Sequence, residues 1–114
     1  MIDLSSLLEL EAVLKPSKDP VVLYKHSTQC GMCDGAIEEV QAFEEQKPAE
    51  VRVYYLDLLA HRDVSNAIAQ KLGVRHESPQ AIVLKEGKPV AVFNHRQVKA
   101  EALRSATQSA SQKW

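Results

Sequence analysis

The sequence of 114 residues has little cysteine, little glycine and few aromatic side chains, and neither sign of charge prevails. It contains two cysteines, four glycines and 5% aromatic residues, and its formal net charge is -1 at neutral pH. A chain of this length favours one modest core, so we expect residues 1–114 to form a single domain. Basic residues are scattered among acidic ones rather than gathered in a stripe, which predicts that nucleic acid is not a partner.

Long apolar runs are also missing. No run approaches the roughly 20 apolar residues that cross a bilayer, and Glu9 and Glu11 interrupt the leucines near the start. The first residues are therefore more typical of an amphipathic helix than of a signal peptide. We expect a soluble cytoplasmic protein without membrane contact. In that compartment a Cys-x-x-Cys pair is more often redox-active or metal-binding than structural.

Hydrophobic periodicity and turn residues predict alternating helices and strands. Ser6 and Glu9 have capping-box spacing, Asp63 is a possible N-cap and Gly73 is typical of a helix end. The predicted elements are a helix over about 5–15, a strand over 21–25, a helix over about 31–46, a strand over 51–58, a helix between 63 and 73, two strands joined through 86–87, and a helix over about 98–106.

This order, α-β-α-β-α-β-β-α, predicts an α/β fold. A β-α-β unit with a right-handed crossover, followed by a hairpin and a helix, gives a four-stranded mixed sheet with helices on both faces. That is the thioredoxin-like arrangement. Lys99 and its neighbours offer no good N-cap for the last helix, and we expect the tail from about residue 107 to 114 to be frayed.

Cys30 and Cys33 stand where a strand turns into a helix. Free backbone N–H groups and the helix dipole at that point favour the thiolate of Cys30. Residues at i and i+3 have Cβ atoms about 5–6 Å apart, whereas a disulfide needs about 3.5–4.5 Å, so the first turn must tighten, which Gly31 permits. We predict that Cys30 is the nucleophile and that Cys33 resolves the mixed disulfide.

A second loop supplies candidate substrate-binding residues. Ser78-Pro79 directly precedes a predicted strand, and in a thioredoxin-like arrangement it lies beside the cysteines. We predict a cis bond there, with the backbone groups of Ser78 available to pair with an extended substrate. Thr28, just before Cys30, is predicted to bind substrate as well. Lys25 and His26 are close enough in sequence to add positive potential if the strand turns them toward the thiols.

Two other interpretations of the cysteine pair stay open. The cysteines could be two buried apolar residues, or they could bind Cu, Zn or an iron–sulfur cluster, with His26 as a further ligand. A closed zinc site takes four ligands and no second Cys or His pair has ligand spacing, so we predict no metal site and no bound cofactor. Met32 is expected to be exposed and to contact partners. The remaining histidines lack partners at recognisable spacing and receive no role: His61, His76 and His95.

Three segments together carry a family resemblance: "YKHSTQC", "LDLLAHRDVSNAIAQKLGVRHESPQ" and "FNH". They resemble the YtxJ-like, bacillithiol-linked monothiol bacilliredoxin family of thioredoxin-fold proteins over nearly the whole chain. The resemblance implies a cytoplasmic role in removing bacillithiol from mixed disulfides on proteins, with Cys30 as the reactive cysteine. The family pattern continues with Pro, a hydrophobic residue and Ser, whereas this chain has Gly31, Met32 and Cys33.

The second thiol allows a mixed disulfide to be resolved within the chain, so reduction of protein disulfides is an equal expectation. We therefore expect a thiol–disulfide oxidoreductase with a low-molecular-weight thiol as co-substrate. Its expected partners are oxidised or S-thiolated proteins and the small thiol or disulfide reductase that recycles it. The alternative is a non-enzymatic protein whose thiols bind metal.

Overall fold

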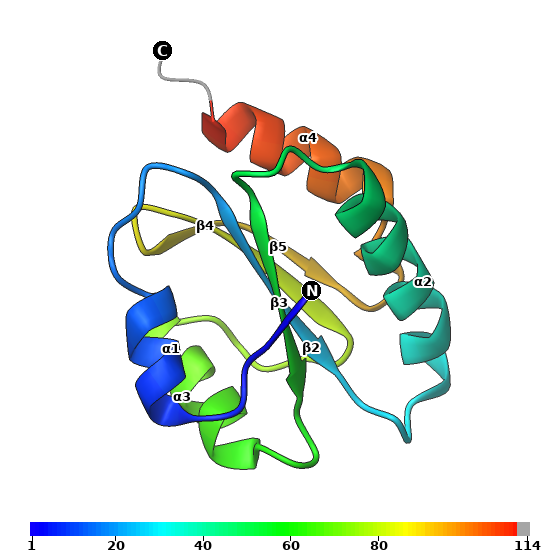
Figure 1. Ribbon diagram of the computed structural model, residues 1–114. Helices are drawn as coiled ribbons and strands as arrows, with labels where there is room; N and C mark the ends of the chain where they lie inside the picture. The colour runs from blue at the N-terminus through cyan, green and yellow to red at the C-terminus, as the bar shows by residue number, and fades with distance from the viewer. Residues whose placement is uncertain (112–114) are drawn as a thin grey trace.

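The computed structural model describes residues 1–111 and shows a central sheet between two layers of helices (Figure 1). The elements are β1 (Ile2–Asp3), α1 (Leu7–Val13), β2 (Val21–His26), α2 (Gly31–Gln46), β3 (Arg52–Asp57), α3 (Arg62–Leu72), β4 (Gln80–Lys85), β5 (Lys88–Asn94), the short 3-10 helix η1 (His95–Gln97) and α4 (Ala100–Ser111). The strand order is β1-β3-β2-β4-β5. Strands β1, β3 and β2 run parallel, whereas β4 and β5 are antiparallel to their neighbours. The predicted mixed sheet with flanking helices is confirmed.

The sheet has five strands rather than the four that we predicted. Ile2 and Asp3 pair in parallel with Tyr54 and Tyr55, and the N–H of Leu4 donates to the carbonyl of Tyr55 at 2.8 Å. Strand β1 is two residues long and both are exposed. Neither an alternating pattern nor an apolar run marks it in the sequence, which is why it was missed.

Helix α4 runs on to Ser111, so the prediction of a frayed chain from about residue 107 is wrong up to that point. Thr107 is buried, and its hydroxyl donates to the carbonyl of Leu103 at 2.7 Å. This bond and the burial fix the helix where the polar sequence suggested fraying. The rest of the predicted tail, residues 112–114, lies outside the described residues.

The caps of the helices are partly local and partly long-range. Ser6 caps α1 as predicted, and Gly73 ends α3 with a φ of 66°. The N-cap of α3 is His61 rather than Asp63, which falls inside the first turn, where the helix dipole favours an acidic side chain. The cap that α4 lacks locally comes from α2, because Glu39 Oε1 accepts the first N–H of α4 at 2.8 Å.

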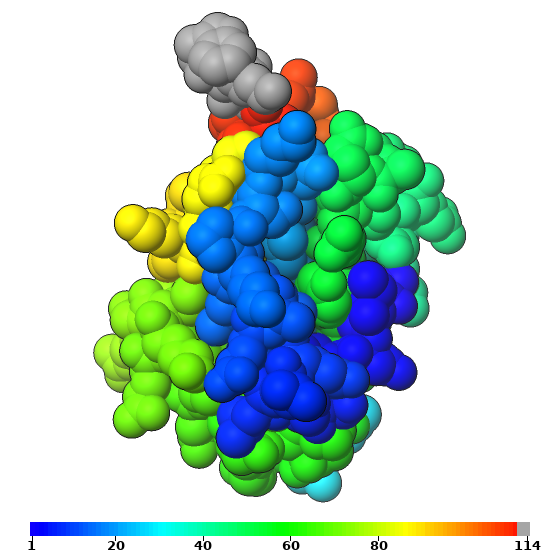
Figure 2. All heavy atoms as spheres, turned by 60° about the vertical axis from the view of Figure 1, so that its left-hand side comes forward, coloured from blue at the N-terminus to red at the C-terminus, as the bar shows by residue number. Residues whose placement is uncertain are grey.

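The turn between β4 and β5 packs on the segment that follows α1, as Figure 2 shows. The turn lies at Glu86 and Gly87, as predicted, with φ angles of 54° and 75°. The N–H of Glu86 donates to the carbonyl of Ser17 at 3.2 Å. A Cβ added at Gly87 would lie 2.4 Å from the carbonyl oxygen of Leu14, so both the close approach and the positive φ require glycine.

Strand β5 forms one edge of the sheet. It begins with the exposed Lys88 and with Pro89, which has no N–H to offer to a neighbouring strand. Its pairing with β4 is irregular between Val83 and Leu84. The outer side of β5 is therefore a poor template for a further strand.

The two helical layers enclose separate apolar cores (Figure 1). One core lies under α2 and α4 and includes Tyr24 and Leu103, and the other lies under α1 and α3 and includes Leu23 and Ile68. All six residues of β2 are buried because the strand is covered on both faces. The end of β2 therefore carries polar side chains into both cores, directly before the cysteine motif.

Candidate functional site

The two thiols lie at the start of α2. Cys30 is the N-cap residue with extended backbone, and Cys33 lies in the first turn. The N–H of Cys33 donates to the carbonyl of Cys30 at 3.0 Å, which tightens this turn, and the two cysteines approach to 3.7 Å. Both are free thiols, Cys30 partly exposed and Cys33 buried. A large substrate therefore has access to Cys30 alone.

The surroundings of Cys33 favour the neutral thiol, but two neighbouring groups also stabilise its thiolate. Burial raises the pKa of the Cys33 thiol, and the neighbouring Cys30 raises it further. The N–H of Ser27 donates to the Cys33 sulfur at 3.4 Å, and the Ser78 hydroxyl lies 3.6 Å from it. These two groups lower the pKa and would stabilise a thiolate during a reaction.

The Ser78-Pro79 peptide bond is cis, as predicted, and it lies beside the thiols. The carbonyl of Ser78 lies 4.0 Å from the Cys30 sulfur, so Ser78 contacts Cys30 through its backbone and Cys33 through its hydroxyl. Pro79 is buried. Thr28 is exposed on the connection between β2 and α2, and its contact with a substrate stays a prediction.

The loop that carries Ser78 is tied to the end of β5. The N–H of His95 donates to the carbonyl of Pro79 at 2.8 Å. The side-chain amide of Gln80 donates to the carbonyl of Arg75 and to Asn94 Oδ1, both at 2.9 Å. These bonds hold the cis-proline loop closed on itself and against η1.

A buried polar cluster on the α2 face of β2 was not predicted. The hydroxyl of Tyr24 bonds to His26 Nδ1 at 2.9 Å, and the rings of His26 and Tyr55 lie 5.4 Å apart. Burial lowers the pKa of His26, so its imidazole is neutral at neutral pH and adds no positive charge beside the thiols. Burial and the nearby Cys33 raise the pKa of Tyr24, which keeps its phenol protonated. Alternation along the strand would have placed both side chains on this face.

Lys25 points to the opposite face of the sheet. It is fully buried, and its Nζ donates to the carbonyl of Ser65 at 3.2 Å and lies 3.1 Å from His76 Nδ1. Burial lowers its pKa to about 8. Lys25 therefore does not face the thiols, and His76, which received no role from the sequence, is its neighbour.

A shallow hollow of about 390 Å³ lies beside the thiol loop, and we call it the Met32 hollow. Its lining residues are Met32, Asn94, His95, Arg96 and Gln97. Met32 is 50% exposed, as predicted. His95 Nε2 lies 3.0 Å from a carboxylate oxygen of Glu77, whereas Arg96 has no ion pair among residues 1–111. The hollow therefore brings an exposed positive charge together with the apolar side chain of Met32, two residues after Cys30.

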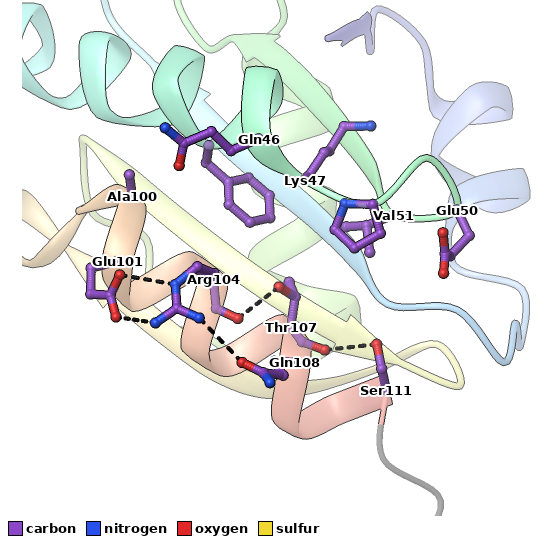
Figure 3. Close-up of a pocket in the computed structure, with 12 residues that line it drawn as sticks. Gln46, Lys47, Glu50, Val51, Ala100, Glu101, Arg104, Thr107, Gln108 and Ser111 are labelled. Carbon is purple, nitrogen blue, oxygen red and sulfur yellow. Dashed lines mark hydrogen bonds and ion pairs between the residues drawn. The ribbon is translucent and has the colours of Figure 1, made fainter.

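A second hollow of about 440 Å³ lies between the end of α2 and α4 (Figure 3). On its α4 side the polar groups bond to one another, since Arg104 donates to Glu101 and to Gln108 (Figure 3). None of the predicted site residues lines it. The Met32 hollow, in contrast, is lined by Met32, which lies between the two cysteines in the sequence.

Two further findings concern metals and membranes. Within residues 1–111, no three His, Cys, Asp or Glu side chains come together in a way that could hold a metal ion. The described helices include none whose length and apolar character would let it cross a bilayer.

The fold and the site define a thioredoxin-fold protein of oxidoreductase type. The chain belongs to the monothiol bacilliredoxin BrxC family, which it matches over residues 2–103. A solved structure described as a candidate oxidoreductase with a thioredoxin fold is 33% identical, with a TM-score of 0.82, over 92% of this chain and 91% of that one.

Two thioredoxins of known structure are more distant. The thioredoxin of Fasciola hepatica is 23% identical with a TM-score of 0.74, over 96% of this chain and 99% of its own. A mutant thioredoxin of Halobacterium salinarum is 21% identical with a TM-score of 0.75, over 99% of this chain and 92% of its own. At these identities they support the fold alone.

Proposed function

We propose that this protein is a thiol–disulfide oxidoreductase that reduces mixed disulfides between proteins and a low-molecular-weight thiol of the bacillithiol type, or disulfides within proteins. One observation carries the proposal: the partly exposed Cys30 begins a helix 3.7 Å from the buried Cys33, with the cis Ser78-Pro79 loop against both. Membership of the bacilliredoxin family supports it. A reducing compartment such as the cytoplasm would favour this direction of electron flow.

The first step transfers the small thiol to the enzyme. The Cys30 thiolate attacks the mixed disulfide, a bond forms between Cys30 and the sulfur of the small thiol, and the protein sulfur leaves as a thiolate that takes a proton from water. The backbone N–H groups at the start of α2 stabilise the attacking sulfur. The protein substrate is thereby restored to its reduced form.

The second step releases the small thiol. Cys33 loses its proton and attacks the Cys30 sulfur, so a Cys30–Cys33 disulfide forms and the small thiol leaves in its reduced form. Ser27 and Ser78 are placed to stabilise the Cys33 thiolate. An external dithiol or reductase then supplies two electrons and two protons to the disulfide. In the monothiol route, a second small thiol attacks the adduct on Cys30 instead.

The Met32 hollow supports a small anionic thiol as co-substrate. Its volume is within the range of small-molecule sites, and the exposed Arg96 offers an ionic partner for a carboxylate. The apolar Met32 adapts to different protein surfaces around the target sulfur. Together they would accept both halves of a mixed disulfide.

The roles of the two cysteines are tested by Cys33→Ser and Cys30→Ser. With an S-thiolated protein as substrate, Cys33→Ser should accumulate the small thiol on Cys30, as detected by mass spectrometry, whereas Cys30→Ser should neither reduce the substrate nor form an adduct. Adducts on Cys33 in Cys30→Ser, with none on Cys30 in Cys33→Ser, would reverse the roles. Failure of the wild-type pair to cycle in redox buffers, with metal bound stoichiometrically, would favour the metal-binding alternative.

The contribution of Arg96 is tested with two substrates. Arg96→Gln should slow the reaction with a mixed disulfide of bacillithiol, which carries carboxylates, by about threefold to tenfold, and should not slow the reaction with hydroxyethyl disulfide. Arg104→Gln on α4 removes a charge of the same kind far from the hollow and is the matched control. Equal slowing of both substrates would contradict the role of the charge.

A further inference from the structure

Lys25 is a buried amine that the thiol chemistry does not use. It is fully buried, and its described partners are the carbonyl of Ser65 and the Nδ1 of His76. Among residues 1–111, no carboxylate pairs with it. Because an ammonium group without a counter-ion costs free energy in a protein interior, packing does not explain why a lysine stands here.

His76 links this lysine to the loop beside the thiols. While Lys25 is an ammonium it has donors only, so Nδ1 then accepts the bond and carries no proton. The Ser65 hydroxyl lies 3.4 Å from the same nitrogen. The residue as a whole is exposed, so protons reach the imidazole from solvent. Two residues further along, Ser78 contacts the sulfurs of Cys30 and Cys33.

We propose that the Lys25–His76 contact positions the loop 76–79 against the two thiols and that protonation of His76 releases this loop. The contact holds the start of the loop from the far face of the sheet, and the bond between Pro79 and His95 holds its end. The inference rests on the proposed function, since the thiols that the loop positions are those of the exchange reaction. Lys25 and His76 are positioning residues and touch no reacting atom.

The charges around His76 set the direction of the pH effect. It is faced by Lys25 on β2, by Arg62 on α3 and by Glu77 in its own loop. Burial and the positive charge of Lys25 lower the pKa of His76, so the imidazole accepts the bond at neutral pH. On acidification the imidazolium faces an ammonium, and the contact is lost. Glu77 opposes this only in part, because Arg75 and His95 also contact its carboxylate.

Three variants separate the contact from its proton sensitivity. His76→Asn places an amide oxygen near the Nδ1 position, so it keeps an acceptor for Lys25 but does not titrate. His76→Leu removes the acceptor, and Lys25→Met removes the donor. His61→Asn replaces a histidine outside this loop and is the matched control. Thermal unfolding verifies that each variant folds.

Two measurements are made between about pH 5 and pH 8, across the range in which histidine titrates. The first is the rate constant for reaction with hydroxyethyl disulfide, expressed as the ratio of variant to wild type so that the titration of the thiols cancels. The second is hydrogen exchange of the amides of residues 76–80. Exchange at these amides follows the loop whether or not the thiols react.

The ratio for His76→Asn should rise by about threefold to tenfold from pH 8 to pH 5, because only the wild type releases its loop. The ratios for His76→Leu and Lys25→Met should be below one at pH 8, with faster amide exchange, and should approach one at pH 5, where the wild type has released its loop as well. The ratio for His61→Asn should not change with pH. A ratio for His76→Asn that is flat with pH, or His76→Leu with wild-type rates and a protected loop, overturns the inference. Slow reaction in Lys25→Met but not in His76→Leu overturns it too, in favour of a direct effect of the ammonium charge. If wild-type Cys30 reacts with no disulfide, the proposed function fails, and amide exchange still decides the inference.

Discussion

The two faces of β2 handle buried polar side chains in different ways. On the face covered by α2 and α4, Tyr24 and His26 bond to each other, and their shifted pKa values leave both uncharged at neutral pH. On the face covered by α1 and α3, the neighbouring Lys25 is equally buried but bonds to a carbonyl oxygen and an imidazole nitrogen. One strand thus carries a neutral pair into one core and an amine into the other.

The two faces therefore act on the thiols in different ways, one through direct contacts and the other through the loop 76–79. On the face toward the thiols, Tyr24 and His26 are neutral, and the groups that contact the Cys33 sulfur from outside α2 are the Ser27 N–H and the Ser78 hydroxyl. A formal charge beside Cys33 would change the proton affinity of the thiol directly. Behind the sheet, the amine of Lys25 reaches the thiols only through the loop that it contacts.

The largest expected effect tests whether the faces differ in chemistry but not in packing. Ile68→Ala and Leu103→Ala truncate fully buried side chains, one in each core. Each should lower the free energy of unfolding by about 2–5 kcal/mol, because each leaves a cavity. Urea unfolding measures both. A cost below about 1 kcal/mol for either one would show that its core is loosely packed and would break the comparison.

The next effect has the opposite sign. Lys25→Met should raise the free energy of unfolding at pH 7 by about 1–3 kcal/mol, because it replaces an unpaired buried ammonium with an apolar side chain of similar length. Because the pKa of Lys25 is about 8 in the fold and 10.5 as a model value, the unfolded chain binds more protons between these pH values.

The wild type should therefore gain stability relative to Lys25→Met as the pH rises from about 8 to 10.5. Urea unfolding of both proteins across this range measures the difference. A difference that stays constant with pH would mean that Lys25 is not destabilised by burial as a charge.

The smallest effect concerns the neutral pair. Tyr24→Phe removes the hydroxyl that bonds to His26 and leaves a buried nitrogen without its partner. The free energy of unfolding should fall by about 1–2 kcal/mol. Tyr54→Phe, on a side chain with no described hydrogen bond, is the matched control and should change it by less than about 0.5 kcal/mol. Equal losses in the two variants would assign the effect to ring packing rather than to the bond.

The parts of the site that were predicted from sequence depend on local geometry. A strand directly followed by a helix fixes Cys30 as the N-cap, and the topology brings Ser78 and Pro79 to that helix start. The turn glycines are recognisable for the same reason, since positive φ angles at Gly73 and Gly87 are rare for other residues. Short-range rules suffice wherever a few consecutive residues decide the conformation.

The parts that were missed depend on contacts between distant segments. The pairing of Ile2 with Tyr54, the cap that Glu39 provides to α4, and the contact of Lys25 with His76 each join residues far apart in the chain. The sequence predicts a buried strand over 21–25, but its pattern does not show which groups a buried Lys25 contacts. Its partners Ser65 and His76 lie 40 and 51 residues further along the chain, beyond the reach of any local pattern.

The irregular edge strand β5 limits how the strands of other chains can pair with this sheet. An uncovered edge strand presents unpaired N–H and C=O groups with which a strand of another chain can pair. With Lys88 and Pro89 at its start and an irregular pairing with β4, β5 is poorly suited to accept such a strand. The β5 edge of the sheet is thus protected against addition of a foreign strand, whichever chain approaches the thiols.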